Sequence, residues 1–453
     1  MDNSTTKILV VAVVAIVALA AIGYAFLGNS DNSDEGETSI GELPVYGNAN
    51  KDMQIDGADK EIIQNIIDGK EGYTLAAYPY ADANNDKVVD SKDLAVVDKI
   101  INGEKTTVFN VNYAEDGGKK VKTYVTETDW PATNAIVMNN MNAASMKIMG
   151  LEDKVVASND KSGGWYDPGL LGYLGDDSII AIDVWGSTSV IDQVSNVLDK
   201  KGDCLMVTTG GIVNGLDINE VEGLGCDVIQ LCDNNPLINE VVSSILLLGF
   251  MFNDMDAGKD IAKLYWKVWN GTMDIAEKIT GTKIKFANGM GTADNAYVYK
   301  GELAGGEFAF ANTDAPINAW GTGYEFGDWV YTYQVDKLFS AAYCNAAAGT
   351  FFGGHENMNA QSYVDGVALY KDMECYQNGD VYMYYYGLPT LYDPLILGSV
   401  MYPELYGDFC DECVHELLVK MGDNPDGKAY ADMDIKLVYS LEEMKNIAEQ
   451  QKK

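Results

Sequence analysis

"NAIVMNNMNAASMKIMGLEDKVVAS", residues 134–158, carries a short apolar run at each end and a helix-like stretch between them. The alternation continues toward the C-terminus, where short apolar runs and helical stretches follow one another. Strands of this kind pack as parallel sheets, because a crossover helix returns the chain to the start of the next strand. The sequence therefore predicts an α/β fold, with strands at 135–138, 155–158, 179–183, 205–209, 227–231, 284–288, 349–354 and 380–386.

The strand pattern is interrupted once by a long helical stretch, expected over residues 255–281. Two groups of strands on either side of one helix predict two Rossmann-like lobes joined by that helix. On periodicity alone, a buried helix of a single domain is an equally good interpretation. Ahead of the first lobe, residues 106–126 alternate around Asp116-Gly117-Gly118 and predict a hairpin.

The composition narrows the classes of ligand and partner. Asp and Glu (68) outnumber Lys and Arg (31), and the net charge of -37 argues against nucleic acid, whose phosphates need a positive field. Every basic residue is a lysine, so the bidentate grip of arginine on carboxylate and phosphate is absent. The seven cysteines are an odd number, and Cys410 and Cys413 predict either core thiols or one local disulfide.

The N-terminal segment contains an uncharged run of apolar residues at 8–27. A helix of that length matches the hydrocarbon thickness of a bilayer, so residues 1–27 predict a transmembrane anchor, with a cleaved signal peptide as the alternative. Residues 28–45 are acidic and predict a flexible linker. We therefore expect the rest of the chain at the cell surface, anchored in the cytoplasmic membrane.

An acidic twelve-residue segment occurs twice, as "NANKDMQIDGAD" at 48–59 and "DANNDKVVDSKD" at 82–93. Both copies carry Asp or Asn at positions 1, 3, 5, 9 and 12, and an amphipathic stretch predicted to be helical follows each copy. This spacing lets a loop wrap a hard cation with oxygens, position 7 offering its backbone carbonyl. Two solvated acidic turns are the alternative. The pattern predicts two calcium ions, held by Asn48, Asn50, Asp52, Gln54, Asp56 and Asp59, and by Asp82, Asn84, Asp86, Val88, Asp90 and Asp93.

The pair of loops, each followed by one helix and ending in Asp, resembles a dockerin module over residues 46–105. That resemblance implies calcium-dependent binding to a cohesin domain on a partner protein. Position 6, usually glycine, is Met53 or Lys87, and a left-handed turn would be strained there. Asn48 at position 1 gives the first site one charge fewer and a lower expected affinity. Positions 10 and 11, which usually contact the partner, are Gly57 and Ala58 in one loop and Ser91 and Lys92 in the other.

Residues 106–425 resemble the iron-siderophore and cobalamin class of substrate-binding proteins of ABC transporters. The likeness is carried by "NAIVMNNMNAASMKIMGLEDKVVAS", "SSILLLGFMFNDMDAGKDIAKLYWKVW", "LYKDMECYQNGDVYMY" and "MYPELYGDFCDECVHELLVKM" in that order. It implies a class III periplasmic-binding-protein-like body that holds a metal chelate, corrinoid or haem-like ligand between two lobes for an ABC permease. Where the family usually has two permease-docking glutamates, this chain has Ala144 and Asp336. Residues 426–453 are expected to form a C-terminal tail.

Ligand contacts are expected on loops at the carboxyl ends of the parallel strands, which face the crevice of such folds. Trp165 and Tyr166 lie on a glycine-flanked loop, and a second aromatic stretch begins at Trp320. His355 could bind a metal in the ligand, or it is a solvated loop residue. The candidates for contact with the ligand are Asn140, Trp165, Tyr166, Thr209, Trp320, Tyr324 and His355.

No catalytic motif is apparent: His415 begins no zinc motif because Val419 stands where a second histidine would be needed. Together with the predicted anchor, the two resemblances imply a non-enzymatic, membrane-tethered solute-binding protein that docks to a cohesin-bearing partner. An adhesion or scaffold component, in which the two-lobed body is not a transport receptor, is the alternative. A metalloenzyme that uses His355 is a third interpretation.

Overall fold

The first sheet contains five parallel strands in the order β5-β4-β3-β6-β7. The computed structural model describes residues 40–116, 120–163, 166, 170–184, 186–209, 217–232, 237–290, 300–309, 334–342, 360–385, 388–423, 427–433 and 435–452. Strands β3 and β6 are buried along their whole length, as expected for strands with helices on both faces of the sheet. The strands are β3 (Ala135–Val137), β4 (Val155–Ser158), β5 (Ile180–Ala181), β6 (Leu205–Thr209) and β7 (Asp227–Leu231).

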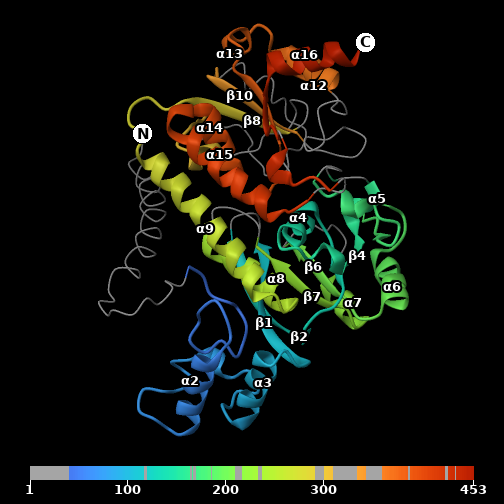
Figure 1. Ribbon diagram of the computed structural model, residues 1–453, viewed down its shortest axis with the longest axis vertical. Helices are drawn as coiled ribbons and strands as arrows, with labels where there is room; N and C mark the ends of the chain where they lie inside the picture. The colour runs from blue at the N-terminus through green and yellow to red at the C-terminus, as the bar shows by residue number, and fades with distance from the viewer. Residues whose placement is uncertain are drawn as a thin grey trace, which may run out of the picture. The chain divides into compact units, whose positions relative to one another are not determined.

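Five helices alternate with these strands and confirm the predicted βαβ pattern (Figure 1). They are α4 (Asn140–Ile148), α5 (Asn159–Gly163), α6 (Val190–Lys201), α7 (Ile218–Gly223) and α8 (Ile238–Met251).

The second sheet has the order β12-β11-β10-β8-β9, with β12 antiparallel to β11 and the other pairs parallel. Its strands are β8 (Lys285–Met290), β9 (Glu307–Phe308), β10 (Lys337–Ala342), β11 (Val381–Tyr385) and β12 (Val438–Ser440). The helices of this half are α10 (Lys300–Leu303), α12 (Ala360–Val367), α13 (Glu374–Gln377), α14 (Tyr392–Met401), α15 (Pro403–Lys420) and α16 (Leu441–Gln451). Strands β9, β10 and β12 were not predicted, and the strand expected at 349–354 lies outside the described residues.

The helix between the two sheets is α9 (Met255–Glu277), somewhat shorter than the expected 255–281. It begins at the N-cap Asp254, whose carboxylate accepts a hydrogen bond from the Ala257 amide at 3.2 Å. It packs against α8 where two glycines meet: a Cβ placed on Gly249 would lie 2.8 Å from the Cα of Gly258. The close approach of α8 and α9 therefore requires glycine.

The hairpin of β1 (Thr106–Asp116) and β2 (Lys120–Trp130) is antiparallel and contacts the edge strand β7 of the first sheet. The Asn112 side chain accepts from the Gln230 amide at 2.9 Å and donates to the Val228 carbonyl at 3.4 Å. These bonds satisfy backbone groups that an open sheet edge would leave unpaired.

Residues 40–45 correct the prediction of a linker that ends at residue 45. Leu43 and Val45 are fully buried, because they supply apolar side chains to the core. The Tyr46 amide donates to the Phe109 carbonyl and the Val111 amide to the Pro44 carbonyl, both at 2.8 Å, and Val45 forms a bridge with Asn110. The segment 44–46 thus lies along β1 as a further extended segment. Residues 28–39 of the expected linker lie outside the described residues.

The C-terminal residues 426–453, expected as a tail, contribute β12 and α16 to the second half of the molecule. The apolar face of α16, including Met444 and Ile447, is buried there. The cysteines of the described residues are free thiols, so Cys410 and Cys413 on α15 form no disulfide with one another. Among the described residues, no helix is long and apolar enough to cross a membrane; the run 8–27 lies outside them.

Candidate cation loops and ligand-binding edge

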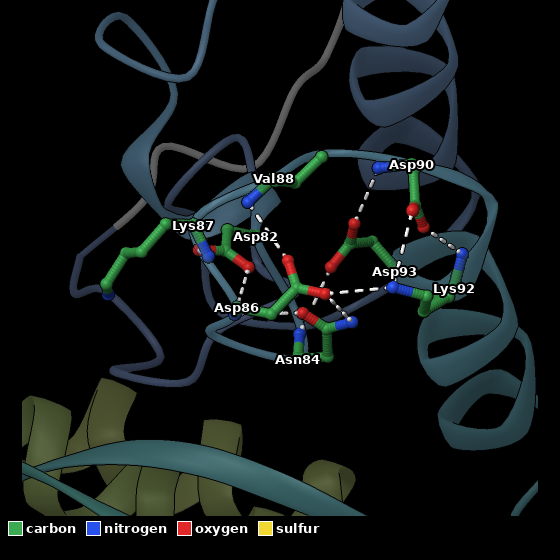
Figure 2. A network of polar contacts seen from close by, with 8 residues as sticks. All are labelled: Asp82, Asn84, Asp86, Lys87, Val88, Asp90, Lys92 and Asp93. Atoms are coloured by element: carbon green, nitrogen blue, oxygen red, sulfur yellow. Dashed lines mark hydrogen bonds and ion pairs between the residues drawn. The ribbon is translucent and has the colours of Figure 1, made fainter.

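The two acidic loops have the same closing contacts at position 12; Figure 2 shows those of the second loop. The Asp93 carboxylate accepts from the backbone amides of Asn84 (3.1 Å) and Asp90 (2.8 Å). Asp59 accepts in the same way from Asn50 (3.0 Å) and Asp56 (2.8 Å). Both carboxylates are buried, which raises the pKa of Asp93 and raises the pKa of Asp59 to about 6. Position 12 therefore folds each loop back on positions 3 and 9.

Positions 9 and 12 also begin the helices that follow. Asp56 and Asp59 form a capping box on α2 (Gly57–Ile67), and Asp90 and Asp93 form one on α3 (Ser91–Ile101). A capping box satisfies amides that the first helical turn leaves free. The acidic residues at these two positions thus have a structural role without an ion, so the argument for an ion rests on positions 1, 3 and 5.

Positions 3 and 5 form successive local turns in both loops. The Asn84 side-chain oxygen accepts from the Asp86 amide (3.0 Å), and the Asp86 carboxylate accepts from the Val88 amide (3.0 Å). In the first loop, Asn50 accepts from the Asp52 amide (3.0 Å) and Asp52 from the Gln54 amide (2.8 Å). The repeat in the sequence is therefore a repeat in conformation.

The expected left-handed turn at position 6 is confirmed for only one loop. Lys87 has a φ of 72°, whereas Met53 is buried and is not among the described residues with positive φ. At position 4 both loops are left-handed, at Lys51 (φ 60°) and Asn85 (φ 55°). At position 6, the strain expected of a left-handed non-glycine residue therefore applies to Lys87 and not to Met53.

Position 1 differs between the loops. Asp82 accepts from the amides of Asp86 (3.0 Å) and Lys87 (2.9 Å). Asn48 instead donates to the carbonyls of Leu43 (2.9 Å) and Asp52 (2.8 Å), and its buried Oδ1 has no hydrogen-bond partner among the described residues. A buried, unpartnered amide oxygen is the kind of group that an ion could satisfy.

The donor set of both loops fits a hard cation, because it consists of carboxylate, amide and backbone oxygens. Within the described residues, however, no three His, Cys, Asp or Glu side chains already converge as a metal site. In the second loop the Lys92 ammonium lies near Asp86 and Asp90 instead. The proposed partner-contact residues Gly57, Ala58, Ser91 and Lys92 are all exposed, on the first turns of α2 and α3.

The carboxyl ends of β3 and β6 form the other candidate site. The chain passes from β3 to β4 on one side and later to β6 on the other, so these adjacent strands mark the topological switch point of the first sheet. Ligands of open α/β sheets bind at such points. Asn139 caps α4, accepting from the Asn142 amide at 2.7 Å, and its Nδ2 donates to the Thr209 hydroxyl at 2.7 Å. The Asn142 Nδ2 donates to the same hydroxyl at 3.3 Å.

Of the predicted ligand residues, Thr209 lies in this network and Asn140 lies next to it, both buried. Asn139 and Asn142 were not predicted, although they belong to the same "NNMN" stretch; the Asn142 Oδ1 is buried without a partner among the described residues. Tyr166 is half-buried and packs against the core of the first lobe. Trp165, Trp320, Tyr324 and His355 lie outside the described residues.

Asp160 is a further polar residue at this edge. It was not among the predicted ligand residues, which in this part of the chain were the aromatic residues Trp165 and Tyr166. It follows β4 in α5 and is buried, and its Oδ2 has no hydrogen-bond partner among the described residues. Burial raises the pKa of its carboxyl to about 7. Asp160 therefore supplies a carboxyl that can be neutral or charged near neutral pH.

The two positions aligned with permease-docking glutamates have different surroundings. Ala144 is buried within α4 and offers no polar surface. Asp336 is exposed; its carboxylate accepts from the Lys285 amide at 2.7 Å, and its own amide donates to the Lys285 carbonyl at 2.8 Å. Asp336 thus holds the start of β10 beside β8 while its surface remains accessible.

The described residues also line two cavities. One of about 20 Å³ lies where α4 meets residues 389–391, and it is lined in part by Asn142, Tyr265 and Thr390. The other, about 630 Å³, is lined by Asp203 and Asp227 at the amino ends of β6 and β7 and by residues of α3 and the hairpin. Because it lies at the opposite ends of the strands from Thr209, the larger cavity is not part of the switch-point site.

No family model matches the chain, and no curated protein is similar to it in sequence. Among solved structures, a TroA-like periplasmic binding protein, FepB, from Veillonella parvula superposes with a TM-score of 0.52 at 13% identity, over 73% of this chain and 99% of that one. The nickel–histidine complex of CeuE from Helicobacter pylori gives a TM-score of 0.48 at 13% identity, over 72% and 97% of the two chains. A periplasmic solute-binding protein from Veillonella parvula gives 0.47 at 11%, over 68% and 92%. The protein has the α/β fold of TroA-like periplasmic binding proteins.

Proposed function

We propose that the two-lobed body is a non-enzymatic receptor that binds a metal chelate, a corrinoid or a haem-like ligand for uptake through an ABC permease. The observation that carries this proposal is the buried Asn139–Asn142–Thr209 network at the switch point, in a fold shared with TroA-like periplasmic binding proteins. Such an edge presents side-chain and backbone donors to a ligand in the crevice. Trp165, Tyr166, Trp320, Tyr324 and His355 are the proposed further contacts from the adjoining loops.

The same proposal assigns residues 46–105 to calcium-dependent docking on a cohesin-bearing partner, with an N-terminal helix at 8–27 as the membrane tether. The matching contacts of the two loops and the unpartnered Asn48 Oδ1 support it. Calcium would supply a positive charge at the centre of each loop. Beyond the capping pairs, the oxygens that would hold it belong to Asn48, Asn50, Asp52 and Gln54 in the first loop and to Asp82, Asn84, Asp86 and Val88 in the second. Gly57, Ala58, Ser91 and Lys92 would face the partner, and Asp336 the permease.

A panel of ligands tests the receptor proposal. Full-length protein is titrated with ferric siderophores, cobalamin and haemin, and binding is followed by quenching of tryptophan fluorescence and by thermal shift. We expect one class to bind, and Thr209→Val to weaken that binding about tenfold or more, because two buried amide donors lose their acceptor at the site. Thr208→Val, one residue earlier on β6, is the matched control. Failure of every ligand to bind would favour the adhesion or scaffold function.

A calcium titration tests the docking proposal separately. Two ions per chain are expected by calorimetry, and capture of a panel of purified cohesin domains should require calcium and stop with a chelator. A chain that binds no calcium would refute this part and leave the receptor proposal standing.

A further inference from the structure

At the carboxylates of positions 5 and 9, the second acidic loop has a charged donor that the first loop lacks, although in both loops the side-chain amide of position 3 donates to the Oδ2 of position 5. In the second loop the Lys92 ammonium lies 3.1 Å from Asp86 Oδ2 and 3.5 Å from Asp90 Oδ2 (Figure 2). The first loop has Ala58 at the position of Lys92. There, neutral amides make the contacts: Asn50 Nδ2 donates to Asp52 Oδ2, and Gln54 Nε2 donates to Asp56 Oδ2, both at 2.7 Å. A charge on one side chain therefore distinguishes the loops.

That charge compensates for a difference between the two sets of acidic residues. The first loop has three carboxylates, since its position 1 is Asn48, whereas the second has four because Asp82 stands there. Each loop also contains one other lysine, Lys51 or Lys87. With Lys92 included, the two loops carry the same net charge.

Lys92 occupies oxygens that a cation in the loop would need. Asp86 and Asp90 are positions 5 and 9 of the calcium spacing, and the ammonium contacts the one oxygen of each that does not accept from a backbone amide of the loop. At Asp86 it shares this oxygen with the Asn84 side-chain amide, which donates to it at 3.2 Å. An ion in the loop and an ammonium at these distances would repel each other, because both are positive and share the same carboxylates. The lysine side chain is 66% exposed, so it can move into solvent without breaking the fold.

We propose that Lys92 is a tethered cation that neutralises the calcium-free second loop, competes with calcium for it, and is released by calcium to the exposed start of α3. There it would stand beside Ser91 on the proposed partner face, where an ammonium suits an acidic surface on the partner. This inference rests on the proposed calcium function of the loops. In this exchange calcium replaces the Lys92 ammonium in the loop, and the same event exposes the positive charge of Lys92 to the partner.

Amine labelling of the full-length protein tests the release directly. The chain is treated briefly with an amine-reactive acetylating ester, with and without calcium, and labelling of each lysine is measured by mass spectrometry. Lys92 should react faster with calcium bound. Lys87 is the internal control, because its ammonium donates to the neutral Asn85 side chain in the same loop. Unchanged labelling of Lys92 would overturn the inference.

Calcium affinities test the competition. Asp52→Ala removes one ligand of the first loop without touching a helix cap, so that titration of this background reports the second loop. In it, Lys92→Met should tighten calcium binding about two- to fivefold, the range for exposed ion pairs. Lys87→Met removes the same charge from the same loop and should have the smaller effect. The converse variant, Ala58→Lys with Asp82→Ala, should weaken the first loop.

The outcomes separate the inference from the proposal beneath it. If Lys87→Met and Lys92→Met change the calcium affinity equally, Lys92 acts only through the net charge of the loop, and the exchange is refuted. If the unaltered chain binds no calcium at either loop, including the first loop that has no lysine at this position, the calcium proposal itself fails.

Discussion

The side-chain amide of Asn139 donates a 2.7 Å hydrogen bond to the hydroxyl of Thr209, joining the ends of two neighbouring strands that the chain visits 70 residues apart. The Thr209 hydroxyl also accepts from Asn142. Both amides are buried, so that the hydroxyl satisfies donors that water does not reach. This contact fixes the start of α4 against β6 at the proposed ligand edge.

Thr209→Val should therefore destabilise the protein as well as weaken ligand binding. It keeps the shape of the side chain but leaves two buried donors short of an acceptor, at a cost of about 1–3 kcal/mol. A shift in the urea midpoint, followed by circular dichroism, measures it. Thr208→Val removes only a weak 3.5 Å contact to a backbone carbonyl and should shift the midpoint less. Equal shifts would show that the Asn139–Thr209 contact is not stabilising.

Gly249→Ala should separate α8 from α9. The new methyl carbon would lie 2.8 Å from the Gly258 Cα and 2.8 Å from the Asp254 carbonyl oxygen, both backbone atoms that cannot turn aside. Overpacking of this kind costs about 1–3 kcal/mol. Gly407→Ala in α15 is the matched control: no atom lies within 4 Å of its added Cβ, and a helix favours alanine over glycine. Melting temperature should fall for the first variant and hold or rise for the second.

Asp160 predicts a specific dependence of stability on pH. Burial raises its pKa from 3.8 to about 7, so the folded protein favours the protonated acid. The contribution of Asp160 to stability is complete below about pH 4 and is lost as the pH rises toward 7, by at most about 4 kcal/mol. Asp160→Asn stays neutral throughout, and its gain in urea midpoint over the parent should be larger at pH 8 than at pH 5. Asp153→Asn, the same substitution at an exposed position, is the control.

Asn48→Asp should have opposite effects with and without calcium. A carboxylate at this buried position cannot donate to the Leu43 and Asp52 carbonyls, so the calcium-free protein should lose about 1–3 kcal/mol. With calcium bound, the added charge should tighten the first loop. Thermal melting in chelator and in calcium measures both effects. A variant that melts lower in both conditions would contradict a cation at position 1.

The regular part of the fold was predictable because it depends on patterns that local sequence carries. Short buried runs such as Ala135–Val137 and Leu205–Thr209 leave few alternatives to parallel strands. Strand β10 was not predicted because Lys337 and Ser340 interrupt its apolar residues, and its identity depends on pairing with β8 and β11. The segment 40–45 reads as linker in the sequence because it follows an acidic stretch. The burial of Leu43 and Val45 depends on a hairpin some sixty residues away, which the local sequence does not reveal.

The sequence identified the stretch that contains the candidate site, but not which side chains of that stretch form the hydrogen-bond network. In "NNMN" the amides at 139, 140 and 142 are alike by type, and only the start of α4 at Asn140 makes Asn139 the cap that reaches Thr209. Positions 9 and 12 of the loops show the converse, because one Asp-x-x-Asp spacing fits both an ion and a helix cap. Sequence spacing cannot separate two roles that need the same oxygens.

The short segment 44–46 ties the repeat module to the body, since it gives and takes backbone hydrogen bonds with β1. Removal of residues 44–46 would leave backbone groups on this side of β1 without their hydrogen-bond partners, and an unpaired strand edge promotes aggregation. In this protein the segment forms backbone hydrogen bonds with β1, so that the repeat module and the hairpin are joined by more than the covalent chain.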